Sequence, residues 1–150
     1  MNDNRNYDYT GWKFHARGEF QTIADWITPN ARVIDLASGN GSLMKILQEQ
    51  KGAVCEGLDL APTGVEFARS HGLNARVAAI DQAASYAGYR DGGFDYAVCN
   101  VTVQMVNYPE VLLAQMKRIG RRQIVSFPNF AYITNRFDMM FRGRMPRPMI

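Results

Sequence analysis

The sequence predicts an α/β fold, with a doubly wound, Rossmann-like parallel sheet of about five strands. Short runs of mostly apolar residues alternate along the chain with stretches whose apolar residues recur at helical spacing. The first run is followed at once by the small residues of 37–41, which include two glycines. Strand, tight turn and helix in this order form β-α-β units with right-handed crossovers, and such units build a parallel sheet.

The predicted strands are mostly apolar runs that end at polar or turn-forming residues. They are 32–37, 54–59, 75–79, 94–99 and 123–127. The run at 94–99 is almost wholly apolar, which is typical of a central parallel strand buried on both faces. Pro128 ends the last run, because proline cannot donate a hydrogen bond to a strand ladder.

The stretches around these strands predict helices. They are 17–27, 42–50, 62–71, a short helix with a loop within 82–92, a helix that begins at 109, and 130–142. Pro29 ends the first helix and Gly52 the second, whereas Pro62 and Pro109 suit the first turn of later helices. Only a short helix is expected within 82–92, because this segment is rich in glycine and other small residues.

Length and composition indicate a single domain over 1–150, with 1–16 as a leader loop. The hydrophobic fraction of 47% supports a buried core, and no run of about 18 apolar residues predicts a membrane span. The polar N-terminus lacks the apolar segment of a secretory signal. Cys55 and Cys99 are the two cysteines, and without CxxC spacing they predict a reduced, cytoplasmic chain with no disulfide and no metal site.

The positive charge is concentrated at the C-terminal end. Residues 1–120 hold 11 Lys and Arg against 13 Asp and Glu, whereas 121–150 hold six arginines against Asp138 alone. This distribution leaves open a solubilising rim or a docking surface for a protein partner within the basic C-terminal segment 130–150. Nucleic-acid binding is not expected, because no RNA- or DNA-binding module with interleaved aromatic residues is present.

The turn at 37–41 is the candidate ligand site. Asp35 lies inside the end of the predicted strand, Gly39 and Gly41 form the turn, and a helix begins directly afterwards. Backbone N–H groups at the helix N-terminus therefore suit an anionic group. Asp59 follows Gly41 by 18 residues, near the offset of about 20 at which a carboxylate binds ribose hydroxyls. Met44 stands where a dinucleotide fingerprint requires its third glycine. The residues therefore predict a nucleoside-cofactor site, with a purely structural turn as the alternative.

The pattern D-x-x-x-G-x-G at 35–41 resembles motif I of class I S-adenosylmethionine (SAM)-dependent methyltransferases, with Ala37 in place of the usual first glycine. The resemblance implies that the turn binds the carboxylate of the cofactor, that Asp35 balances its ammonium, and that Asp81 lies near the adenine. It also places Asn100 at the reactive end. With SAM or S-adenosylhomocysteine (SAH) as ligand, the implied cofactor-binding residues are Asp35, Ala37, Ser38, Gly39, Asn40, Gly41, Asp59, Leu60, Asp81, Gln82 and Asn100.

A closer resemblance rests on longer motifs. The stretches 17–27 and 118–130, the run Arg-Gly-Arg-Met-Pro at 142–146, and Gln104 resemble the MetW (methionine biosynthesis protein W) family. That resemblance implies a class I methyltransferase fold linked to methionine biosynthesis and to activation of a homoserine O-acyltransferase, with no established methyl acceptor. The family's usual Gly-Cys-Gly turn is Ala-Ser-Gly at 37–39 in this chain.

Relative to that family, the chain stops at Ile150, before the last two strands of a seven-stranded sheet. The fifth strand is therefore expected to have an uncovered edge, which indicates a truncated chain or pairing with another chain, such as a homodimer through this edge or the C-terminal segment.

Two functions remain open from the sequence. One is methyl transfer from SAM to an unidentified small acceptor, and the other is a non-catalytic SAM- or SAH-binding partner of the acyltransferase. No catalytic base can be named, since His15 and His71 are isolated histidines. Asn100 is followed by Val101, so the Asn-Pro-Pro-Tyr motif of amide and nucleobase N-methylation is absent.

Overall fold

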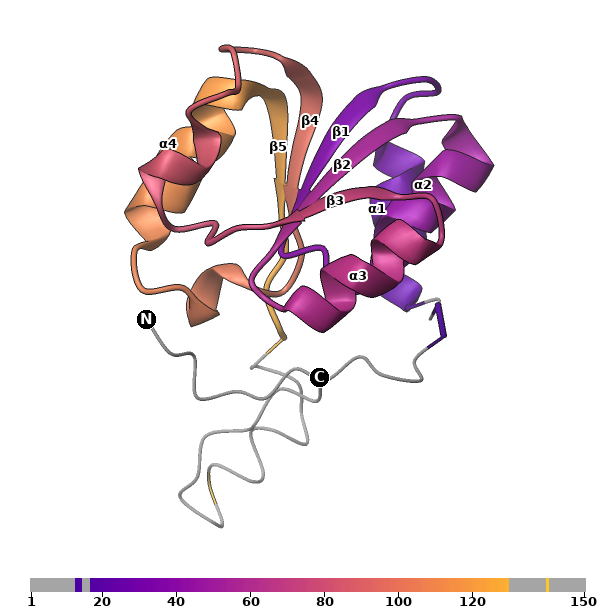
Figure 1. Cartoon of the computed structure of the whole chain (residues 1–150), viewed down its shortest axis with the longest axis horizontal. Coiled ribbons are helices and arrows are strands. Elements are labelled where there is room, and N and C mark those ends of the chain that lie inside the picture. Colours follow the sequence, from indigo (N-terminus) through magenta and orange to yellow (C-terminus); the bar gives the residue numbers. More distant parts are fainter. Residues whose placement is uncertain (1–12, 15–16, 130–139, 141–150) are drawn as a thin grey trace.

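The computed structural model describes residues 13–14, 17–129 and 140, and it contains a five-stranded sheet in which all neighbouring strands are parallel. The strands are β1 (Arg32–Leu36), β2 (Val54–Asp59), β3 (Asn74–Val77), β4 (Phe94–Cys99) and β5 (Gly120–Val125). Their order in the sheet is β3-β2-β1-β4-β5 (Figure 1). The chain adds β2 and β3 on one side of β1 and then β4 and β5 on its other side, so the strand order reverses between β1 and β4. Ligands of open α/β sheets bind at such a point.

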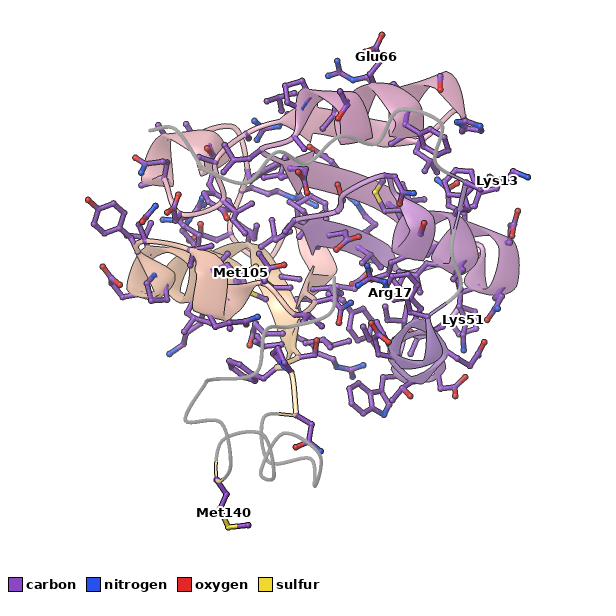
Figure 2. All side chains as sticks on the ribbon, turned by 90° about the horizontal axis from the view of Figure 1, so that it is seen from below. Lys13, Arg17, Lys51, Glu66, Met105 and Met140 are labelled. Atoms are coloured by element: carbon purple, nitrogen blue, oxygen red, sulfur yellow. The ribbon has the colours of Figure 1, made fainter. Side chains whose placement is uncertain are left out.

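Helices cover both faces of the sheet (Figure 1). They are α1 (Gly18–Trp26), α2 (Ser42–Lys51), α3 (Pro62–Ser70) and α4 (Pro109–Ile119), with two short 3-10 helices, η1 (Ala83–Tyr86) and η2 (Val103–Met105). Helices α1, α2 and α3 lie on one face, and α4 lies on the other. Glu66 is exposed on the outer side of α3 (Figure 2). The doubly wound arrangement predicted from the sequence is thus confirmed.

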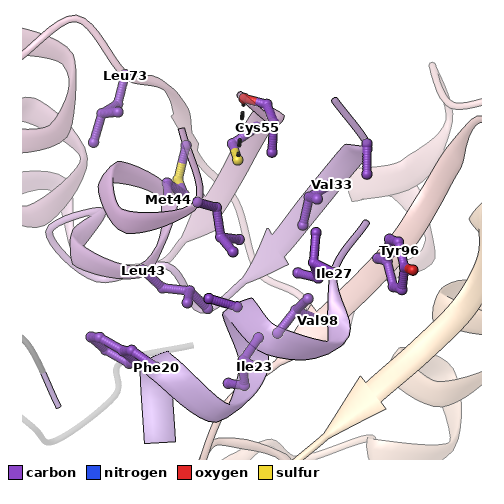
Figure 3. Packing of buried hydrophobic residues seen from close by; sticks show 14 of the residues in the cluster. Phe20, Ile23, Ile27, Val33, Leu43, Met44, Cys55, Leu73, Tyr96 and Val98 are labelled. Carbon is purple, nitrogen blue, oxygen red and sulfur yellow. Dashed lines mark hydrogen bonds between the residues drawn. The ribbon is translucent and has the colours of Figure 1, made fainter. Parts of the chain in front are cut away.

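The first core lies between the sheet and helices α1 to α3. Phe20 and Ile23 of α1 approach Leu43 of α2, and Val33 and Tyr96 close the cluster from the sheet (Figure 3). These side chains are all at most 8% exposed. The apolar residues at helical spacing are therefore buried, as predicted, because each helix packs one apolar face against the core.

The second core lies on the opposite face, under α4 and η1. Tyr86 is fully buried there, and its hydroxyl donates a 2.6 Å hydrogen bond to the carbonyl oxygen of Ile80. Leu112 and Met116 of α4 are also fully buried against this face. The short helix expected within 82–92 is the 3-10 helix η1, and it contributes to this core through Tyr86.

The observed bounds of the strands agree with the predicted ones for some strands and not for others. Strands β2 and β4 have the predicted bounds, 54–59 and 94–99. The prediction of a fifth strand at 123–127 is wrong at both ends, because β5 begins at Gly120, which pairs with Phe94, and ends at Val125. Arg121, Arg122 and Gln123 are exposed on this edge strand, so its first half lacks the apolar pattern of a buried strand.

Several sequence-based expectations fall outside the described residues. They concern the leader 1–12, His15, and the helix over 130–142 with its basic surface, of which the structure describes only Met140. Within the described residues, no helix has both the length and the apolar character needed to cross a bilayer.

Candidate cofactor-binding site

The turn between β1 and α2 has three residues with positive φ. Gly39 has φ 55° and Gly41 has φ 81°, and both conformations suit glycine. A Cβ on Gly41 would also lie 2.5 Å from Cδ1 of Leu73, so this position has no room for a side chain. Ala37 has φ 71°, which places an L side chain in the left-handed region. Ala37 therefore introduces local backbone strain at the start of the turn.

Most of the turn's amides donate within the protein. The amides of Ala37 and Ser38 both donate to the carbonyl oxygen of Leu58, at 2.7 and 3.1 Å, and the amide of Gly41 donates to that of Ser38 at 2.9 Å. The amide of Gly39 donates to Asp59. The expectation that the whole turn offers its N–H groups to a ligand therefore needs correction. Within 37–41, only Asn40 has an amide without an acceptor among the described residues.

Asp59 connects the turn to the next strand. Its Oδ2 accepts from the amide of Gly39 at 2.7 Å, and its Oδ1 accepts from the amide of Ala61 at 2.8 Å. Burial raises the pKa of this carboxyl, and backbone hydrogen bonds oppose that rise. Each carboxylate oxygen can accept more than one hydrogen bond, so Asp59 retains capacity for a ribose hydroxyl. Leu60, which follows it, is 50% exposed at the same edge of the sheet.

Asp35 lies beneath the turn, near the end of β1. It pairs with Gly57 of β2 and Val98 of β4, and it is only 2% exposed. Burial raises the pKa of its carboxyl to about 7, and the nearby Asp59 carboxylate adds to this effect. No lysine, arginine or histidine among the described residues forms an ion pair with Asp35 or Asp59. A cation from a ligand would therefore meet two uncompensated acids.

Ser38 lies on the same side of the sheet. A Cβ on Gly57 would lie 2.6 Å from both Ser38 Oγ and Met44 Sδ, so the absence of a side chain at Gly57 makes room for them. Ser38 is 8% exposed, and its hydroxyl has no hydrogen-bond partner in the described part of the chain. An unsatisfied buried hydroxyl is costly to the folded state, and such groups occur at sites that bind ligands or water.

Asn40 joins the turn to α2 and to residue 13. Its Oδ1 accepts from the amide of Ser42 at 3.2 Å and from Ser42 Oγ at 2.7 Å, which stabilises the start of α2. Its Nδ2 donates to the carbonyl oxygen of Lys13 at 3.3 Å. Phe14 packs edge-on against Phe67 and His71 of the α3 region. Lys13 is thus bonded to the glycine turn, and Phe14 packs against the α3 region.

Asp81 lies after β3 at the same edge of the sheet and is 7% exposed. Its Oδ2 accepts a 3.0 Å hydrogen bond from the amide of Asn107, which precedes α4. Gln82 is exposed and directly precedes η1. Asp81 therefore connects the loop after β3 to the loop after β4, a contact between residues that are far apart in the sequence.

The segment after β4 is held by hydrogen bonds that involve Asn100, Gln104 and a serine to which the sequence assigned no role. Ser126 Oγ donates to Asn100 Oδ1 and accepts from the amide of Val101 at 3.0 Å. Val101 has φ 54°, a strained conformation for a β-branched residue. Gln104 Nε2 donates to the carbonyl oxygen of Val101 at 2.7 Å and supports the same conformation. The role of Ser126 was missed, although it begins the Ser-Phe-Pro-Asn-Phe run within the stretch that suggested a family.

The arrangement favours binding over nucleophilic chemistry. Burial raises the pKa of the Cys55 and Cys99 thiols to about 12, so neither is a ready nucleophile. His71 stacks on Phe67 and contacts its carbonyl oxygen through Nδ1 at 2.8 Å. Among the residues that the structure describes, no group of three or more His, Cys, Asp and Glu could hold a metal ion. What the edge of the sheet does provide is acids, amides and hydroxyls.

A parallel sheet with an acid, a glycine turn and a second acid at its switch point defines an α/β domain of the Rossmann-like methyltransferase fold. Solved structures share this fold. A SAM-dependent methyltransferase of Thermotoga maritima matches with a TM-score of 0.64 and 19% identity, over 89% of this chain and 58% of that one. Geranyl diphosphate C-methyltransferase of Streptomyces coelicolor A3(2), in a complex that contains SAH, matches with a TM-score of 0.60 and 17% identity, over 71% and 45%.

The chain belongs to the MetW family, because residues 17–150 match the family described as methionine biosynthesis protein MetW. It is 32% identical over 138 residues to the bifunctional methionine biosynthesis protein MetXA/MetW of Rhodopirellula baltica. The aligned region covers 85% of this chain and 21% of that protein. It is 30% identical over 92 residues to a ubiquinone biosynthesis O-methyltransferase of Xanthomonas oryzae pv. oryzae, which covers 59% and 38%. The chain thus spans less than half the length of these two relatives.

Proposed function

We propose that this chain binds SAM or SAH at the carboxyl ends of β1 and β2. The observation that carries the proposal is the 2.7 Å hydrogen bond from the amide of Gly39 to Asp59, because it joins the glycine turn to the second acid in one unit. In this unit Asp59 accepts from the ribose hydroxyls, Asp35 faces the ammonium, and the amide of Asn40 donates to the ligand's carboxylate. Asp81 and Asn100 lie toward the adenine and the reactive end, respectively.

The activity proposed for the bound cofactor is methyl transfer to an unidentified small acceptor, in the cytoplasm and in connection with methionine biosynthesis. The fold shared with SAM-dependent methyltransferases supports this activity. Displacement at a sulfonium methyl depends largely on positioning, which can supply about 7–11 kcal/mol of the barrier. A site without an obvious catalytic base is compatible with such a reaction when the acceptor is already nucleophilic.

The second candidate is a non-catalytic partner that binds SAM or SAH and activates a homoserine O-acyltransferase. A specific observation favours it: the Rhodopirellula baltica relative combines MetXA and MetW in one bifunctional protein. Fusion of two proteins in one chain is consistent with a physical association of their separate counterparts. The exposed edge of β5 is a proposed contact surface for a partner or a second copy, because edge strands present unpaired backbone groups.

Isothermal titration calorimetry with SAH tests the site. Asp59→Ala removes the acid that joins the turn to β2, and we expect SAH affinity to fall about tenfold or more, since hydrogen bonds to charged groups contribute about 1.5–3 kcal/mol. Asp91→Ala is the matched control, because Asp91 is an exposed carboxylate that pairs with Arg118 away from the turn. Equal SAH affinity in wild type and Asp59→Ala would exclude the proposed site.

Co-purification with a homoserine O-acyltransferase separates the two activities. A stable complex that raises acyltransferase activity, with no transfer of labelled methyl from SAM to a pool of small metabolites, supports the non-catalytic partner. Labelled methyl in a small product, at the same rate with and without the acyltransferase, supports the methyltransferase.

A further inference from the structure

The amino ends of β1, β4 and β5 lie together at the edge of the sheet opposite the candidate cofactor site (Figure 1). Arg32 and Arg121 flank one carboxylate there, because the amide of Arg32 donates to Asp95 Oδ2 at 2.9 Å and Arg121 Nη1 lies 3.5 Å from Asp95 Oδ1. The turn before β4 carries Arg90, and a Cβ on Gly92 of this turn would lie 3.9 Å from Arg121 Cγ. Three exposed arginines from separate parts of the chain therefore meet at this edge.

Most of this positive charge is not balanced by the fold. The side chain of Arg121 is 70% exposed, and no carboxylate among the described residues forms an ion pair with Arg32 or Arg90. Arg118 nearby has a structural role by contrast, since its guanidinium donates to two backbone carbonyl oxygens and to Asp91. Clustered like charges oppose folding through repulsion. The exposed arginines therefore indicate a negatively charged group outside the described part of the chain.

Two large apolar side chains are exposed next to these arginines. Val54 pairs in register with Arg32 at the start of β2 and is 65% exposed. Trp26 is 62% exposed and is the last residue of α1, from which a short loop leads to Arg32. Tryptophan and arginine are the residues most enriched among those that dominate binding in protein interfaces. The amino edge of the domain is the surface formed by these exposed apolar residues and arginines, namely Trp26, Arg32, Val54, Arg90 and Arg121.

We propose that the amino edge docks a protein partner whose surface presents carboxylates around an apolar patch. This inference rests on the second candidate function, the partner of a homoserine O-acyltransferase, and it names the surface through which that contact is made. A guanidinium can bind a carboxylate through two parallel hydrogen bonds, which favours an acidic partner. The surface adjoins the edge of β5, because Arg121 belongs to both.

The acids within the amino edge favour a protein partner over a nucleic acid. Asp95 lies between two of the arginines, and the side chain of Asp91 is 80% exposed beside Arg118. Both carboxylates repel a phosphate backbone, whose binding depends on neutralisation by cations. A protein surface carries groups of both signs, so it can pair with the arginines and also with Asp91.

The position of this surface leaves the cofactor site accessible. Strand β1 has five residues, and a parallel strand rises about 3.3 Å per residue, so the two ends of the sheet are about 16 Å apart. The partner at the amino edge and the ligand at the carboxyl edge therefore bind without steric conflict. SAH affinity measured with and without the partner should differ by less than about twofold.

Surface plasmon resonance with an immobilised homoserine O-acyltransferase tests the docking surface. Arg32→Gln/Arg121→Gln removes two exposed charges, and we expect the Kd to rise about tenfold, chiefly through slower association. Association of the wild type should slow as ionic strength rises from about 50 to about 300 mM, and the double variant should show a weaker salt dependence. The matched control is Arg17→Gln/Lys45→Gln, which removes two exposed cations away from the amino edge and should bind as the wild type does.

Trp26→Ala tests the apolar part of the surface. Loss of an aromatic anchor should raise the Kd about tenfold, mostly through faster dissociation. Leu113→Ala is its matched control, because Leu113 is an exposed apolar residue of α4 outside the amino edge. Both amino-edge variants should keep the SAH affinity of the wild type, which shows that they remain folded.

A Kd within twofold of the wild type for either amino-edge variant, when the wild-type complex forms, would overturn this inference and leave the second candidate function standing. A wild-type chain that does not bind the acyltransferase would reject that function and this inference together. Binding of a single-stranded RNA oligonucleotide that is lost in Arg32→Gln/Arg121→Gln would assign the surface to nucleic acid and also overturn the inference. A complex that forms without any SAH binding would reject only the proposed cofactor site.

Discussion

Replacing Asp35 with asparagine removes a buried charge while keeping the size and shape of the side chain. Because Asp35 is 2% exposed and lies among buried strands, the folded protein must either protonate it or bear the cost of a buried carboxylate. In the unfolded chain the carboxyl ionises at its usual pKa of 3.8, whereas burial raises the folded pKa to about 7. The stability of the wild type should therefore depend on pH in a way that Asp35→Asn does not.

The direction and magnitude of this pH dependence of stability follow from the two pKa values. Between them the folded state holds a proton that the unfolded state has lost, so the free energy of unfolding falls as the pH rises. The fall begins near pH 4 and ends near pH 7, and it amounts to about 4 kcal/mol in total. Between pH 5 and pH 8, the stability of Asp35→Asn relative to wild type should increase by about 3 kcal/mol.

Urea unfolding of both proteins at pH 5, 6.5 and 8 measures this difference, with Asp25→Asn as the control for replacing an exposed carboxylate. The control should follow the wild type at every pH. The reasoning would be refuted if the stability difference between Asp35→Asn and wild type were the same at pH 5 and pH 8, since a pH-independent difference would report altered packing instead of a buried titratable group.

Two further predictions concern the turn and the part of β2 that packs against it. Ala37→Gly relieves the left-handed conformation at φ 71° and should raise the free energy of unfolding by about 0.5–1 kcal/mol in urea, whereas an unchanged or lower stability would contradict the strain. Gly57→Ala inserts a Cβ 2.6 Å from Ser38 Oγ and Met44 Sδ and should lower stability by about 1–3 kcal/mol. Its matched control is Gly88→Ala, where a Cβ meets nothing within 4 Å and thermal stability should hardly change.

The sequence predicts the interior of this fold better than its edge. Strands β2 and β4 have interior positions in the sheet, so burial gives them apolar runs whose limits can be recognised in the sequence. Within the described residues strand β5 pairs with β4 alone, and its exposed Arg121, Arg122 and Gln123 lack the apolar pattern from which a start at Gly120 could be predicted. A Cβ on Gly120 would lie 2.7 Å from Ala97 Cβ, and this close contact between strands has no signature in a single sequence.

For the candidate site, the sequence predicts which strand ends carry the polar groups but not how these groups pair. The topology alone places Asp35 and Asp59 at one edge of the sheet, because parallel strands end together. The bond between Gly39 and Asp59 spans 20 residues and that between Asn107 and Asp81 spans 26, and each depends on side-chain and loop geometry. The same holds for Ser126, which follows β5 and donates to Asn100 after β4.

The hydrogen bonds within the turn determine which groups of the proposed site remain available to a ligand. Glycine turns attract anions through free amides, but here most of the amides of 37–41 serve the fold itself. Under the proposed function, discrimination between ligands therefore depends more on the acids beneath and beside the turn than on the turn itself. Asp59 accepts the hydrogen bond from Gly39 and, in the proposed function, also binds the ligand, so its loss should reduce both stability and binding. Among the described residues Asp35 accepts no hydrogen bond from the turn, so in the proposed function its amide variant should separate the two effects: it should gain stability relative to wild type at high pH and bind SAH more weakly.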